Sequence, residues 1–128
     1  MNFPEDLRYT KDHEWARSKD GRVTVGITGF ATDQLGDVVY VELPAVGAQV
    51  KKGEAFGVVE STKAVSDLYA PVSGKVVEIN APLVDAPEGI NEDPYGKGWM
   101  IVVAPSNPQE LDELLDPKAY TALVQEQH

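Results

Sequence analysis

The sequence predicts a mainly β fold: a flattened barrel or sandwich of two antiparallel sheets with approximate twofold symmetry, plus short helices and a C-terminal helical extension. Three observations lead to this prediction. Glycine-led apolar segments occur twice along the chain, a strand-turn-strand pattern lies between the two copies, and two capped apolar stripes follow the second copy. Paired strand sets joined through one hairpin are typical of small sandwiches and barrels.

The internal repeat has two parts. Gly36–Val41 is echoed by Gly74–Ile79, and Gly53–Val59 is echoed by Gly98–Val103. The second copy is longer because residues 81–95 add proline, glycine and acidic residues, a composition typical of a loop insertion.

The hairpin between the copies spans Val58–Tyr69, whose ends alternate apolar and polar residues around a short polar turn. We expect Lys63 to stand at the tip of this turn, although the Asn-Gly or Asp-Gly pair of a strong turn signal is absent. Small neighbours leave its amine unobstructed. Lys63 is therefore a candidate for covalent modification by another enzyme; the alternative is an ordinary solvated lysine. Its place between the repeat copies favours modification.

The N-terminal third predicts a cover, a hairpin and a helix. Residues 2–7 are expected to form a short irregular or helical cover, and Trp15 to anchor the next segment in the core. The turn residues Asp20-Gly21 and the alternation after them predict a hairpin over about residues 14–28. A short helix that starts at Thr28 or Gly29 should follow and run through Leu35, ended by Gly36.

The C-terminal residues predict two helices within about residues 107–126, both lying against the sheet. Asn107 and Pro108 mark the first helix start, with Glu110 placed to reach back to the cap. Asp116-Pro117 repeats this device. The apolar stripes are Leu111, Leu114 and Leu115, then Tyr120, Leu123 and Val124. We therefore expect residues 1–128 to form a single domain with a core at about 22–104.

Composition limits the function. A formal net charge of −10 argues against nucleic-acid binding, which needs clustered lysine and arginine. The absence of cysteine excludes disulfides and thiolate sites, and only His13 and His128 offer imidazole, so no metal site is expected. We see no bilayer-spanning run, signal peptide or coiled-coil seam. A monomer without membrane contact is expected, cytoplasmic or, if a transit peptide is missing from the sequence, from the mitochondrial matrix.

No nucleophile elbow, phosphate-binding glycine loop or HExxH motif is present. The acidic residues allow a carboxylate-pair enzyme with Glu14, Asp67 or Glu60 as acid and base, but most carboxylates in so acidic a chain are solvated. A modified lysine explains more, because an acyl group on Lys63 would make an arm more than about 10 Å long that carries an intermediate between active sites.

A series of short segments then matches one known family. They are His13-Glu14-Trp15, Val25-Gly26-Ile27-Thr28, Leu35-Gly36-Asp37, Val41-Glu42-Leu43-Pro44, Glu60-Ser61-Thr62-Lys63-Ala64, Ser66-Asp67, Pro71-Val72-Ser73-Gly74, Pro94-Tyr95 and Gly98-Trp99-Met100. In this order, and with the helical tail, they resemble the glycine cleavage H proteins nearly from end to end. Both terminal extensions separate the chain from isolated lipoyl domains. Biotin carrier domains have a Met-Lys-Met tip, which this chain lacks.

The resemblance implies a lipoyl-domain-like fold and a non-catalytic lipoyl carrier, with lipoic acid amidated to Lys63. Such a carrier takes the aminomethyl group from the P protein of glycine catabolism to the T protein, and passes electrons to the L protein. Glu60 and Ala64 are the neighbours that a lipoate-protein ligase or lipoyl transferase would read. Glu14 and Asp67 match positions lining the cleft that shelters the loaded arm, where a carboxylate suits the cationic amine; the alternative is that both are surface acids.

Two departures from the family pattern and two alternative functions stay open. Thr62 stands where valine is common, a near-isosteric change, and Gln34 stands where many relatives have histidine, which puts a titrating cleft wall in doubt. The alternatives are a lipoyl relay to other proteins and an unmodified protein-binding module.

Overall fold

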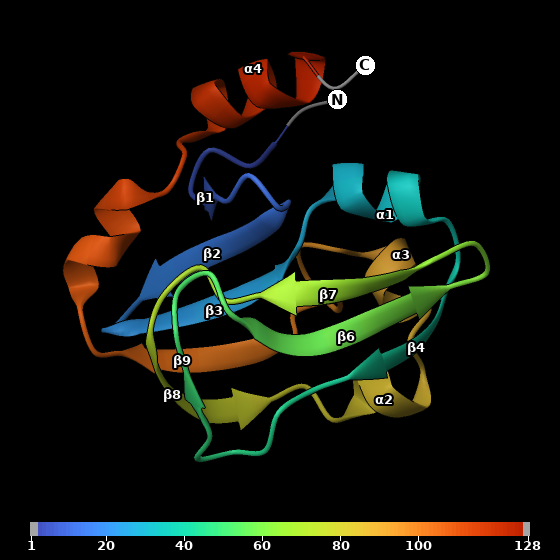
Figure 1. The fold of residues 1–128 in the computed structure, drawn as a ribbon, viewed down its shortest axis with the longest axis horizontal. Coiled ribbons are helices and arrows are strands. Elements are labelled where there is room, and N and C mark those ends of the chain that lie inside the picture. The colour runs from blue at the N-terminus through green and yellow to red at the C-terminus, as the bar shows by residue number, and fades with distance from the viewer. Residues whose placement is uncertain (1–2, 127–128) are drawn as a thin grey trace.

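A computed structural model describes residues 3–126 as two antiparallel sheets packed into an unclosed sandwich with short helices at its edges (Figure 1). The predicted fold class is thereby confirmed. The larger sheet contains, in spatial order, β1 (Arg8–Tyr9), β2 (Glu14–Lys19), β3 (Arg22–Ile27), β9 (Ile101–Pro105), β8 (Gly74–Ile79) and β5 (Gln49–Val50). The smaller sheet contains β4 (Val38–Glu42), β6 (Ala55–Ser61) and β7 (Val65–Tyr69). The helices are α1 (Gly29–Leu35), α2 (Pro82–Asp85), α3 (Gly89–Glu92), the 3-10 helix η1 (Pro108–Glu113) and α4 (Pro117–Glu126).

The internal repeat is visible as a matching bulge in each sheet. The register of β4 against β6 shifts between Val38 and Tyr40, and that of β8 against β9 shifts between Val76 and Glu78. These are equivalent positions of the first echo, so a local bend recurs where the sequence pattern recurs. The partner strands do not keep the alignment of the second echo. Val38 pairs with Ser61, which lies outside that echo, whereas the equivalent Val76 pairs with Val103. Apolar runs fix the face of a strand, but a run can be aligned at more than one register.

The predicted N-terminal hairpin and helix are confirmed. β2 and β3 turn through Asp20 and Gly21, which have φ angles of 54° and 77°. The Thr28 hydroxyl accepts from the Ala31 N–H and caps α1. Gly36 ends this helix with a φ of 77°, a value that L side chains rarely adopt.

The secondary structure differs from the prediction in one N-terminal segment and in the insertion at residues 81–95. The short strand β1 pairs with β2 and was not predicted, because two residues are too few to show alternation. Residues 81–95, expected to be a loop insertion, contain the short helices α2 and α3. Each helix is four residues long, so neither shows a helical period, yet each buries one apolar side chain, Leu83 or Ile90, against the sandwich core.

The C-terminal extension keeps its predicted caps but differs in one contact. The Asn107 side chain accepts from the Gln109 N–H, and the helix that follows is 3-10 rather than α. The Glu110 carboxylate was expected to reach back to this cap. It instead accepts from the backbone N–H and the hydroxyl of Ser73, at 2.7 and 3.0 Å. A tertiary partner thus replaces the local one, and η1 is tied to the turn before β8.

The core has two parts. The larger part lies between the sheets, and the smaller part is an aromatic cluster formed where α4 covers the N-terminal segment. The smaller cluster contains Phe3, Leu7, Tyr9, Trp15, Phe30, Tyr120 and Val124. Trp15 is fully buried, as predicted, and its indole N–H donates to the Pro94 carbonyl at 2.9 Å. None of the helices between residues 3 and 126 is long and apolar enough to cross a bilayer.

Candidate functional site

The predicted lysine turn is present between β6 and β7. The Ser61 N–H donates to the Ala64 carbonyl at 2.8 Å, which closes the turn. The Ser61 hydroxyl oxygen accepts from the N–H groups of Lys63 and Ala64, at 3.1 and 3.0 Å. One serine thus satisfies most of the turn's backbone donors, so the turn is ordered although its residues are exposed. Lys63 stands at its tip, open to solvent.

The neighbours predicted to be read by a modifying enzyme lie beside the lysine. Ala64 is exposed in the turn. Glu60 is half-buried on β6 and pairs with Tyr40 of β4 and Val65 of β7. Tyr40 and Val65 are among the large apolar side chains that the fold leaves exposed. The turn therefore adjoins a sheet surface with both an acidic and an apolar character.

A cleft of about 150 Å³ lies between β7, α1 and the segment before β2. Its lining residues are Asp12, His13, Glu14, Ile27, Ala31, Gln34, Leu35, Val59, Ser66, Asp67 and Leu68. The structure thus places Glu14 and Asp67 around one cavity, together with Gln34. Asp67 is exposed, whereas Glu14 is buried.

Glu14 is 1% exposed, and its two carboxyl oxygens face different partners. One accepts from the Thr10 hydroxyl at 2.6 Å, and the other faces the Tyr69 N–H at 3.3 Å. Loss of hydration raises the pKa of Glu14 to about 8, more than these hydrogen bonds lower it. Burial therefore favours the neutral acid at pH 7. A cation entering the cleft would favour the carboxylate instead.

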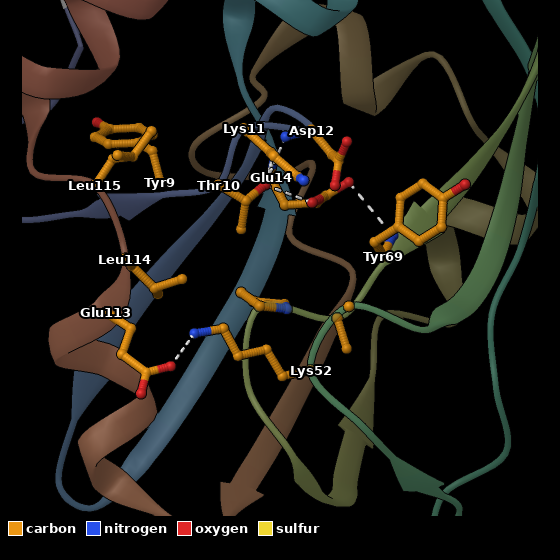
Figure 2. A pocket seen from close by; sticks show the side chains of 13 residues that line it. Tyr9, Thr10, Lys11, Asp12, Glu14, Lys52, Tyr69, Glu113, Leu114 and Leu115 are labelled. Atoms are coloured by element: carbon orange, nitrogen blue, oxygen red, sulfur yellow. Dashed lines mark hydrogen bonds and ion pairs between the residues drawn. The ribbon is translucent and has the colours of Figure 1, made fainter.

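Glu14 also lines a second cavity (Figure 2). This cavity of about 270 Å³ is bounded by Tyr69, Leu114 and the Lys52–Glu113 ion pair. The sequence carried no signal for it, because its walls come from four separate segments of the chain. Asp12 and Glu14 thus line both cavities.

One wall of the cleft is connected to α4 by hydrogen bonds that the sequence did not reveal. The Tyr120 hydroxyl lies 2.8 Å from Nδ1 of His13 and 2.7 Å from the Thr28 hydroxyl. His13 lines the cleft and Thr28 caps α1, so the C-terminal helix helps to fix both. Within residues 3–126, no three histidine or carboxylate side chains are placed to hold a metal ion, and His128 lies outside the described residues.

Comparison of the chain with known proteins identifies its family. The sequence profile of the glycine cleavage H proteins matches residues 7–127. The chain belongs to this family. Glycine cleavage system H proteins of Anaeromyxobacter sp. and Oceanobacillus iheyensis are 68% and 56% identical to it, over 99% and 98% of the chain and 99% and 100% of the relatives.

A solved structure agrees with the sequence relatives. The crystal structure of a glycine cleavage system H protein from Mycobacterium marinum is 47% identical, with a TM-score of 0.90 over 96% of this chain and 99% of that one. H proteins are the lipoyl carriers of the glycine cleavage system, so the family expected from the short segments is confirmed.

Proposed function

We propose that this chain carries lipoic acid as an amide on Lys63 and acts as a non-catalytic substrate of its partner enzymes, with residues 1–128 forming one carrier domain. The supporting observation is the exposed lysine on a hydrogen-bonded turn, within the segment Glu60-Ser61-Thr62-Lys63-Ala64. The residues fit the group, because a lipoyl chain needs an accessible amine and small side chains flank this one. Bound lipoate would supply a dithiolane able to accept an aminomethyl group and two electrons.

The proposed partners follow from the family. The P, T and L proteins of the glycine cleavage system would each meet the Lys63 turn in succession. A lipoate-protein ligase or lipoyl transferase would first recognise Glu60 and Ala64, which lie beside the lysine on β6 and in the turn. We propose that the chain acts as a monomer, so that the turn stays open to each partner.

Glu14 and Asp67 are the proposed contacts for an aminomethyl group sheltered in the cleft. Asp67 offers an exposed carboxylate, and Glu14 offers a buried acid whose proton would leave when a cationic amine approaches. A charge-assisted hydrogen bond to each is stronger than one between neutral groups. Both side chains would hold the amine in the cleft, while neither would take part in breaking a bond.

Intact-mass measurement after reaction with lipoate and lipoate-protein ligase tests the proposal. We expect one lipoyl increment on the full chain, absent from Lys63→Arg and retained in Lys75→Arg, a matched change of another exposed lysine on a strand. Adding P protein and glycine should then reduce the lipoylated chain only. An increment on Lys63→Arg, or none on the unaltered chain, would refute attachment at Lys63.

A further inference from the structure

The Lys63 turn is attached to the segment between α1 and β4. The Thr62 N–H donates to the Asp37 carbonyl at 3.1 Å. The aliphatic part of the Lys63 side chain lies over Gly36, since a Cβ added to that glycine would come within 2.9 Å of the lysine Cε. Both the backbone of the turn and the stem of its lysine therefore rest on two residues of another segment.

That segment is in turn held by one side chain, Asn91 of α3. The Asn91 side-chain nitrogen donates to the Gly36 carbonyl at 2.9 Å, and its oxygen accepts from the Val38 N–H at 2.8 Å. A side-chain amide donates from its nitrogen and accepts at its oxygen, so asparagine matches a backbone carbonyl and an N–H two residues apart. Asn91 thereby fixes the peptide groups on either side of Asp37, the residue that anchors the turn.

We propose that Asn91 is a positioning residue for lipoyl attachment: by holding residues 36–38, it determines where the Lys63 amine is presented to the attaching enzyme. This inference rests on the proposed function of Lys63. Neither side-chain hydrogen bond of Asn91 goes to the lysine or to its turn. Asn91 therefore acts on the turn through residues 36–38. The insertion of the second repeat copy thus serves the lysine of the connecting hairpin.

Loss of the Asn91 side chain should change which orientations the turn adopts, and should leave the exposure of the Lys63 amine unchanged. Without Asn91, water can replace its two hydrogen bonds, and the Asp37 carbonyl becomes free to move away from the Thr62 N–H. The turn then samples more orientations, and the fraction suited to the enzyme falls. An apparent affinity falls in proportion to that fraction. The KM of the ligase for the apo chain should rise, while kcat changes little once the correct orientation is bound.

The experiment compares Asn91→Ala and Asn91→Asp with Asn80→Ala in the full apo chain. Asn80 is a matched control, because its side-chain nitrogen donates to the carbonyls of Lys97 and Trp99, at 2.8 and 2.7 Å, outside the lysine turn. Asn91→Asp keeps the acceptor for Val38 and loses the donor to Gly36, and serves if Asn91→Ala does not fold. Three readouts are needed: ligase KM and kcat, amide hydrogen exchange at Thr62, and Lys63 acylation by a small N-hydroxysuccinimide ester.

We expect Asn91→Ala to raise the ligase KM about three- to tenfold, which corresponds to the net contribution of one hydrogen bond. Thr62 exchange should accelerate, and Lys63 acylation by the small ester should stay within about twofold, because that reagent senses only exposure. The KM and the Thr62 exchange rate of Asn91→Asp should lie between those of the unaltered chain and Asn91→Ala. Asn80→Ala should change neither quantity.

Equal KM values for the Asn91 and Asn80 variants, or unchanged Thr62 exchange in both Asn91 variants, would overturn the inference. A lack of lipoylation of the unaltered chain would instead count against the proposed function. In that case, Thr62 exchange alone would decide whether Asn91 positions the turn.

Discussion

The two ends of the β6–β7 hairpin contrast sharply. At the tip, Lys63 and Ala64 are exposed, Val65 is 68% exposed, and the Ser61 side chain holds the turn together. At the base, Leu68 is buried and the Tyr69 N–H faces the buried Glu14 carboxyl group. The hairpin is therefore anchored in the core at one end and projects at the other (Figure 1). The buried base and the contacts of the turn with Gly36 and Asp37 together hold the lysine in a defined place.

The largest expected effect is at the base, through the ionisation of Glu14. Its pKa is raised from 4.5 to about 8 by burial, so the folded chain keeps a proton that the unfolded chain releases. Stability should fall as pH rises between these two values, at up to about 1.4 kcal/mol per pH unit. Glu14→Gln should remove this loss, measured as the free energy of unfolding in urea between about pH 5 and pH 8.

The difference between the two proteins isolates Glu14 from other titrating groups. At about pH 5 the free energy of unfolding of Glu14→Gln should equal that of the unaltered chain or be lower by about 1 kcal/mol, because the amide replaces one hydrogen bond of the acid imperfectly. Glu14→Gln should be the more stable protein at about pH 8. Asp67→Asn, which changes an exposed carboxylate of the same cleft, is the control and should keep the original slope. Parallel pH profiles for Glu14→Gln and the unaltered chain would contradict the burial argument.

The strand β6 near the base of the hairpin should be sensitive to a single methyl group. A Cβ at Gly57 would collide with the backbone carbonyl of Glu42 on β4, and backbone cannot move aside as a side chain can. Gly57→Ala should therefore destabilise the fold by about 2–3 kcal/mol, measured by thermal or urea unfolding. Gly89→Ala, in α3, is the control, because its Cβ would meet side-chain atoms of Leu83 and Lys97 and no backbone of another segment. The stability of this variant should change by less than about 1 kcal/mol. Similar losses in both variants would remove the explanation by backbone collision.

The smallest effect is expected at the tip. Ser61→Ala removes the acceptor for the N–H groups of Lys63 and Ala64, but both are exposed and water can replace it. We expect a loss of about 0.5–1.5 kcal/mol, with faster amide exchange at these two residues. Ser66→Ala, on β7, should leave their exchange unchanged. If exchange stayed slow in Ser61→Ala, the turn would owe its order to something other than this side chain.

Sequence patterns predicted the local features well. Alternation and turn chemistry placed the β2–β3 hairpin, the cap of α1 and the Lys63 turn, because each depends on residues only a few positions apart. The same reasoning failed for Glu110, whose local cap interaction lost to a contact with Ser73, 37 residues away. It also missed α2 and α3, which are too short to show a period.

What the sequence by itself determined is the course of the strands, the exposed lysine and the family to which the chain belongs. The tertiary structure decided the environment of that lysine and of the cleft. Glu14 meets Tyr69, and Gly36 meets Asn91, across 55 residues in each case. No periodicity or spacing reports such a contact, because it arises only when two sheets and an inserted segment pack together. The raised pKa of Glu14 and the anchoring of the Lys63 turn are consequences of that packing.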